Sequence, residues 1–122
     1  DERTRQRNPE NRRESKMKPF NRVFVPNPNF RFPTEKLEEL ADQIVYISDR
    51  PIFDDSLENE SYQRTLESRL EDFDCERDVI AFYGDPLIFA MAIFYLAEDG
   101  AVLNVARFST KLDQYLVKKI SD

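Results

Sequence analysis

Residues 78–97 have the sequence DVIAFYGDPLIFAMAIFYLA, the most informative local pattern in the chain. Its first six residues are rich in β-branched and aromatic side chains, which predicts a strand over Asp78–Tyr83. Gly84 then favours a tight turn, Asp85 is a preferred N-cap residue, and Pro86 suits the first helical position. The apolar residues from Pro86 to Ala97 predict a helix in the core, because they are about half as many as a membrane span needs.

Two strands and a helix are expected before this stretch. Arg22–Val25 is a short β-type run that ends at prolines. Thr34 is a good N-cap residue, and a helix is expected after it. Its apolar residues at helical spacing are Leu37, Leu40, Ala41 and Ile44. Ile44–Ile47 then predicts a second strand that is buried on both faces.

The remaining elements flank residues 78–97 on both sides. A second helix is expected over about Ser56–Leu70, where the apolar residues again follow the helical period. Its apolar face consists of Tyr62, Leu66, Leu70 and Phe73. Ala101–Phe108 and Gln114–Ile120 predict two strands, and the short link between them indicates an antiparallel hairpin.

The element order predicts the fold class. Strands that alternate with helices favour a mainly parallel sheet with right-handed crossovers. We therefore expect one three-layer α/β domain over residues 19–122, in the order β-α-β-α-β-α-β-β, with a C-terminal antiparallel hairpin. Residues 1–18 contain no Leu, Ile, Val or aromatic residue, so we expect them to form a separate, polar N-terminal arm.

The composition excludes several common chemistries. The chain has no histidine, which removes histidine metal ligands and every Ser-His or Cys-His nucleophile arrangement. Cys75 is the single cysteine, so neither an internal disulfide nor a cysteine zinc site is possible. We expect a protein that is not an enzyme, with no cofactor and no metal site. One free cysteine and no signal peptide favour the cytoplasm.

Charge is distributed unevenly along the chain. The net charge is −6, but residues 1–18 carry +3 and the rest −9. The basic residues of the arm are Arg3, Arg5, Arg7, Arg12, Arg13, Lys16 and Lys18. They are candidates for contact with nucleic-acid phosphates or with a protein partner. A passive tail is the third alternative, in which residues 1–16 are an upstream extension before Met17.

The turn Gly84-Asp85-Pro86 is the candidate ligand site. It follows a strand, and ligands in open α/β sheets bind at the carboxyl ends of strands, where a helix N-terminus can hold an anion. The alternative is a purely structural cap. The cap is favoured, because a phosphate site needs several glycines and the chain has only Gly84 and Gly100. Asp85 would also repel a phosphate.

An acidic segment surrounds the second helix. Its carboxylates are Asp54, Asp55, Glu58, Glu60, Glu67, Glu71, Asp72, Asp74, Glu76 and Asp78. Their spacing does not match an EF-hand loop, so a solvated helix face is favoured over a Mg²⁺ or Ca²⁺ site or a DNA-mimicking surface.

The hairpin offers a further surface. Arg107 and Tyr115 are expected to lie across it from each other, as cross-strand packing or as a cation–π pair. Lys111, Lys118 and Lys119 discourage unwanted strand pairing at the open edge, although the same edge is able to accept a partner strand.

The chain also resembles a group of small proteins encoded in tailed-phage and prophage genomes, over about residues 22–120. The residues that carry the resemblance are Val23-Phe24-Val25-Pro26-Asn27, Leu70, Asp72, Phe73, Arg77-Asp78, Gly84-Asp85-Pro86, Ala90, Ala92, Ala97, Arg107-Phe108 and Tyr115. Phe108 departs from the pattern because it stands in place of a tryptophan, and Lys111 and Asp113 replace part of a basic turn. The resemblance implies a phage origin but no catalytic residue.

These features lead to three functional hypotheses. The first is a non-enzymatic, phage-type accessory or virion-associated protein that acts through protein contacts, including self-association, in the host cytoplasm or on the virion. The second is a nucleic-acid-associated protein that uses its basic arm. The third is a small nucleotide-binding protein or enzyme that uses the Gly84-Asp85-Pro86 turn. No membrane association is expected.

Overall fold

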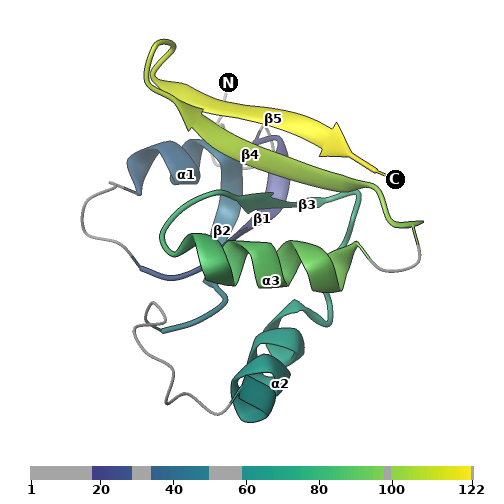
Figure 1. Ribbon diagram of the computed structural model, residues 1–122. Helices are drawn as coiled ribbons and strands as arrows, with labels where there is room; N and C mark the ends of the chain where they lie inside the picture. Colours follow the sequence, from purple (N-terminus) through teal and green to yellow (C-terminus); the bar gives the residue numbers. More distant parts are fainter. Residues whose placement is uncertain (1–17, 29–33, 50–58, 98–99, 122) are drawn as a thin grey trace, which may run out of the picture.

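The computed structural model describes residues 18–28, 34–49, 59–97 and 100–121. In these residues, strands and helices alternate until a final pair of strands (Figure 1). The elements are β1 (Phe20–Val25), α1 (Glu35–Leu40), β2 (Ala41–Tyr46), α2 (Asn59–Leu70), β3 (Asp78–Ala81), α3 (Pro86–Leu96), β4 (Leu103–Ser109) and β5 (Gln114–Ile120). None of the helices in the described residues has the length and apolar content that a membrane crossing requires.

The strands form one five-stranded sheet in the order β2-β1-β3-β4-β5. Parallel pairing joins β1 to β2 and to β3, and it joins β3 to β4. The last two strands, β4 and β5, pair antiparallel. These pairings confirm the expected α/β class, with a mainly parallel sheet and a C-terminal antiparallel pair. They also leave β2 and β5 as the two edges of the sheet.

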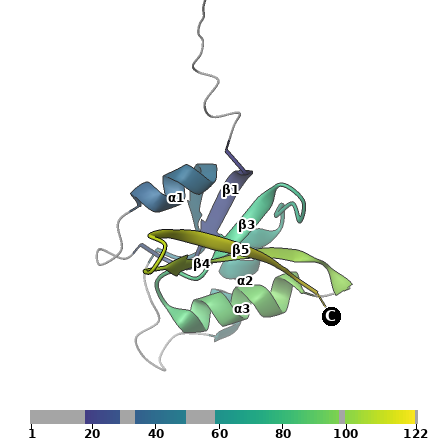
Figure 2. The ribbon, with the colours of Figure 1, turned by 90° about the horizontal axis from the view of Figure 1, so that it is seen from above.

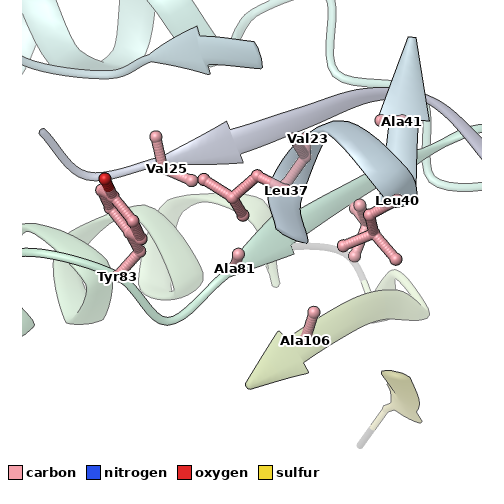
Figure 3. Packing of buried hydrophobic residues seen from close by; sticks show 9 residues of the cluster. Val23, Val25, Leu37, Leu40, Ala41, Ala81, Tyr83 and Ala106 are labelled. Carbon is pink, nitrogen blue, oxygen red and sulfur yellow. The ribbon is translucent and has the colours of Figure 1, made fainter. Parts of the chain in front are cut away.

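The core lies on both faces of the sheet, because side chains alternate along each strand. In β1, Val23 and Val25 belong to one buried cluster and Phe24 belongs to another. Leu37 and Leu40 of α1 pack in the first cluster, which Figure 3 shows. The helices α2 and α3 contribute Leu66, Leu70, Ile88 and Ala92 to the second cluster. Figure 2 accordingly shows α1 and α3 on opposite sides of the strands.

The helix expected after Thr34 is shorter than the helical spacing of its apolar residues, which continues to Ile44. α1 ends at Leu40, and Ala41 already has extended backbone, with φ −149° and ψ 161°. Ala41 pairs with Phe20 of β1, so it is the first residue of β2. The apolar residues at helical spacing therefore belong to two different elements. Pairing with β1 supplies the backbone hydrogen bonds that another helical turn would otherwise have made.

Two further expectations about this region are corrected. The second strand covers Ala41–Tyr46 rather than Ile44–Ile47, and it lies at an edge of the sheet. Its apolar half is only half-buried, because an edge strand has a neighbour on one side alone. Thr34 holds the N-cap position of α1, but its side chain makes no capping hydrogen bond.

In α2, the described side chains that the apolar pattern assigned to the core side are buried. α2 starts at Asn59, while residues 56–58 of the expected helix lie outside the described residues. Leu66 and Leu70 are buried, and Phe73 packs against the same cluster, as the apolar pattern predicts. The side chain of Tyr62 lies outside the described part of the structure.

α3 differs from the expected core helix. It covers Pro86–Leu96, close to the predicted bounds. Ile88 and Ala92 are buried, whereas Leu87 is 53% exposed and Phe94 is 75% exposed. A helix that packs on a sheet with one face leaves its opposite face to solvent unless another layer covers it. The apolar stretch is thus half core and half surface.

Candidate functional site

The carboxyl ends of β1 and β3 lie side by side, because these strands are parallel neighbours. The chain leaves β1 toward α1 on one face of the sheet and leaves β3 toward α3 on the other. In open α/β sheets, ligands commonly bind where neighbouring connections diverge in this way. Gly84, Asp85 and Pro86, the turn that the sequence singled out, lie at this position.

Asn27, which follows β1, occupies the space between the two strand ends. Asn27 is only 2% exposed. Its Oδ1 accepts a hydrogen bond from the backbone N–H of Asp85 at 2.7 Å, and its Nδ2 donates to the carbonyl of Pro28 at 2.8 Å. Gly84 has a φ of 82°, and a Cβ at this residue would lie 2.5 Å from Asn27 Oδ1. Glycine is therefore the residue that fits between the two loops.

Asp85 caps α3 as the sequence predicts. Its carboxylate Oδ1 accepts a hydrogen bond from the backbone N–H of Leu87 at 2.8 Å, and Pro86 occupies the first helical turn. The cap uses an N–H that an anion would otherwise approach, and it adds negative charge at the same place. The geometry of the turn thus serves the connection between β3 and α3.

The structural role of Asn27 was not recognised from the sequence, where Asn27 was only one of the residues that carry the resemblance. The available signal was an asparagine between Pro26 and Pro28, since asparagine side chains readily bond to nearby backbone groups. The partner at Asp85 is 58 residues away, so local sequence could not identify it.

The arm falls almost entirely outside the described residues. Lys18 is the exception, and it lies half-buried just before β1. Arg3, Arg5, Arg7, Arg12, Arg13 and Lys16 are not among the described residues. Contact of the arm with nucleic acid or with a partner remains a prediction.

A charged network, which was not predicted from the sequence, lies at the opposite end of the sheet. Arg22 of β1 donates from Nε to Asp78 Oδ1 at 3.3 Å and from Nη2 to Asp78 Oδ2 at 2.7 Å. Its Nη1 reaches Asp72 Oδ2 at 3.1 Å. Asp78 is 1% exposed, whereas the Asp72 side chain is 74% exposed. This branched set of hydrogen bonds from one guanidinium holds together β1, β3 and the segment that follows α2.

One guanidinium, that of Arg22, pairs with two carboxylates in this network. The hydrogen bond to Asp78 is the largest of the effects that raise the pKa of Arg22 from its ordinary value, and burial opposes it. Asp78 Oδ2 also accepts from the backbone N–H of Asp74 at 2.9 Å. A depression of about 550 Å³ adjoins the network and is lined by Asn21, Arg22, Asp42, Gln43, Asp72, Asp74, Arg77 and Asp78. Within the described residues, no three His, Cys, Asp or Glu side chains come together as a metal-binding group.

A groove with apolar walls lies between α3 and the hairpin. It has a volume of about 430 Å³. It is lined by Phe82, Phe89, Val105, Ala106, Arg107, Leu116, Val117, Lys118 and Ile120. The rings of Phe82 and Phe89 meet edge to face, with centroids 5.2 Å apart. Arg107 and Lys118 are the charged residues of this lining, which contains no carboxylate although the chain is acidic.

α3 also has an apolar outer stripe. Leu87, Ala90 and Phe94 follow at helical spacing and are all exposed. α3 contains no charged residue on any side. An amphipathic surface helix normally has a polar outer face, so an apolar one indicates contact with another molecule. We call the groove and this stripe together the apolar surface.

The expected contact between Arg107 and Tyr115 is wrong. Tyr115 lies opposite Phe108, and their ring centroids are 5.4 Å apart, while Arg107 lies opposite Leu116. Side chains alternate along each strand, so Arg107 and Tyr115 point to opposite faces of the hairpin. The pKa of Tyr115 is raised to about 12, mainly because the side chain is buried and to a smaller extent because of the charge interaction with the nearby Tyr83.

Comparison with known proteins does not add a family to these observations. No family model matches the chain, and neither a curated protein nor a solved structure matches it.

Proposed function

We propose that this chain is a non-enzymatic, phage-type accessory or virion-associated protein that acts through protein contacts, including self-association. The contacts are made by the apolar surface, which consists of the outer stripe of α3 and the groove. The supporting observation is Phe94, a large apolar side chain that is 75% exposed on a helix without charges. Leu87, Phe82 and Ile120 extend the exposed area, each about half exposed.

The free energy available from such a surface is substantial. Full burial of one Leu, Ile or Phe side chain contributes roughly 1.5–3 kcal/mol relative to leaving it exposed. Four half-exposed side chains of this kind therefore represent several kcal/mol by the same rule, which is enough to drive association once a partner covers them. Monomeric proteins rarely leave large apolar patches uncovered.

The phage origin in this proposal rests on the resemblance in residue pattern. Within that pattern, Asp72 and Asp78 hold Arg22, and Gly84-Asp85-Pro86 forms the turn against Asn27. These residues hold strands and helices together. This assignment supports a role in assembly or recognition rather than in catalysis.

The test is sedimentation of the full chain over a wide concentration range. We expect a mass above the 14.5 kDa of one chain. The substitution Phe94→Ser combined with Leu87→Ser should shift the protein toward the monomer with its circular dichroism unchanged. Leu112→Ser is the matched control, because Leu112 is 55% exposed but lies in the hairpin turn. A wild-type chain that stays monomeric throughout would overturn self-association through this surface.

A second candidate function follows from the basic arm. Its seven cations are suited to neutralising phosphates, so binding of nucleic acid should weaken steeply with salt. Fluorescence anisotropy with labelled duplex and single-stranded DNA, with and without residues 1–17, measures this directly. Salt-sensitive binding that disappears with the arm supports this second function. Equal binding by the shortened chain contradicts it.

A further inference from the structure

The open edge of β5 has a definite hydrogen-bonding pattern. The backbone N–H of Phe82 donates to the carbonyl of Ala106 at 2.8 Å, so the polar groups of Ala106 point toward β3. Along a strand these groups point alternately to the two sides. Val105 and Arg107 therefore bond to β5, through the residues opposite them, Lys118 and Leu116.

This pattern identifies the backbone groups of β5 that have no partner within the sheet. Tyr115, Val117 and Lys119 alternate with Leu116 and Lys118, so their N–H and C=O groups point away from β4. Among the described residues no strand lies beyond β5. An exposed row of this kind is a template for pairing with another strand. It borders the groove on the side away from α3.

We propose that β5 pairs antiparallel with β5 of a second copy of this chain, about a two-fold axis through Val117. This inference rests on the self-association in the proposed function: it names a second copy as the partner and adds a contact at β5 that is distinct from the stripe of α3. The two sheets then form one continuous sheet of ten strands. Symmetric pairing of identical edges is self-complementary, as closed dimers require.

Geometry selects the register. Residues whose backbone N–H and C=O groups point away from β4 must lie opposite residues of the same kind in the second copy. The centre of the pairing therefore keeps Tyr115, Val117 and Lys119 opposite one another. Centring on Val117 pairs the whole strand Gln114–Ile120 with its copy. Any other centre leaves part of the strand without a partner, and centring on Lys118 places that ammonium against itself.

The charges fit the register that is centred on Val117. Lys119 lies opposite Tyr115 of the second copy, where its stem packs beside the ring, while its ammonium donates to Asn104 Oδ1 of its own chain at 3.4 Å. It is also diagonal to Asp113 of the second copy, a carboxylate that is 76% exposed and pairs with Lys36 of its own chain at 3.4 Å. Lys118 lies opposite Leu116 of the second copy and diagonal to the second copy's Lys118, so neither lysine directly faces a like charge, and the one like-charge pair across the axis is the diagonal one.

The pairing also accounts for exposed apolar residues. Val117, 40% exposed, becomes covered by Val117 of the second copy. The axis is perpendicular to the sheet, so both α3 helices lie on the same side. The two grooves, each lined by Leu116 and Ile120, then join across the axis into one wider apolar surface.

Disulfide trapping tests the register in the full chain. In a Cys75→Ser background, Val117→Cys places two thiols opposite each other, with Cα atoms about 5.5 Å apart, which is within disulfide range. Under a glutathione redox buffer, we expect the crosslinked fraction to exceed that of Thr110→Cys by about tenfold, because paired thiols have a high effective concentration. Thr110 is exposed in the hairpin turn.

Val117→Pro provides a second test. It removes an N–H that makes no bond to β4, so the variant should fold, as circular dichroism will show, but it should not pair. We expect its dimer to dissociate at least tenfold more readily than wild type in sedimentation experiments.

The outcomes separate this inference from the proposed function. Fast crosslinking at Val117 together with weakened association of Val117→Pro supports edge pairing. A multimer that depends on Phe94, but that crosslinks no faster at Val117 than at Thr110, overturns edge pairing and leaves the proposed function intact. A wild-type chain that is monomeric at every concentration overturns both.

Discussion

The side-chain oxygen of Asn27 accepts a hydrogen bond from the backbone N–H of Asp85 at 2.7 Å, across 58 residues of sequence. This bond joins the loop after β1 to the turn before α3, where the two connections diverge. Asn27 is buried, and Gly84 lies so close to its side chain that a Cβ at Gly84 would clash with Asn27 Oδ1. The side chain that is tolerated at one residue therefore depends on the other.

Gly84→Ala should destabilise the protein by about 2–3 kcal/mol. A non-glycine residue with positive φ costs roughly 1–2 kcal/mol, and the new Cβ also meets Asn27 Oδ1. Gly100→Ala is the control, because Gly100 has a φ of 72° with nothing within 4 Å of its Cβ position. Urea unfolding should show a loss of only about 1 kcal/mol for Gly100→Ala. Equal losses for the two variants would contradict the close approach.

Asn27→Ala should cost about 1–3 kcal/mol, because it leaves the N–H of Asp85 without its acceptor. The same substitution removes the atom that a Cβ at Gly84 would meet. The double variant Asn27→Ala, Gly84→Ala should therefore be more stable than the sum of the single losses predicts. A double-mutant cycle from urea unfolding measures this coupling. Strict additivity would show that the two loops relax independently.

Asp78→Ala should destabilise by about 3 kcal/mol, since it leaves Arg22 and the N–H of Asp74 without their buried acceptor. Asp72→Ala removes the exposed partner of the same guanidinium and should cost less than about 1 kcal/mol. Denaturant unfolding of the two variants at neutral pH gives the comparison. A larger loss for Asp72→Ala would reverse the assignment of the buried partner.

Titration of Tyr115 should make stability fall at high pH. Its pKa is raised from 10.0 to about 12 in the folded chain, so folding favours the neutral phenol. This contribution is fully present below pH 10 and is lost as the pH rises through about 12. We expect the wild type to lose stability relative to Tyr115→Phe over that interval, measured by urea unfolding at each pH. A constant difference between the two proteins would contradict the shift.

Local sequence was sufficient where one segment supplied all of its own interactions. The cap at Asp85 was predicted correctly because its hydrogen bond reaches only to Leu87. The bounds of β5 were also correct, since a short link holds its register against β4. The boundary between α1 and β2 was wrong, because the pairing of Ala41 with Phe20 outweighed a helical spacing that continued to Ile44.

The candidate surfaces were harder to predict than the elements. The sequence placed all of α3 in the core, and only the packed sheet showed that Phe94 faces outward. Arg22 and Asp78 are 56 residues apart, so no local pattern connected them. The amphipathic rule failed for α3 because its two faces have the same apolar composition, and burial alone distinguishes them.

By itself, the sequence determined the alternation of strands and helices, the turn at Gly84 and the absence of histidine chemistry. These follow from backbone preferences and from composition, which act within a few residues. The tertiary structure alone decided the strand order, the partners of Asn27 and Arg22, and the exposed side of α3. Those outcomes depend on which distant segments pack together, and the free energy of that packing is shared among residues far apart in the chain.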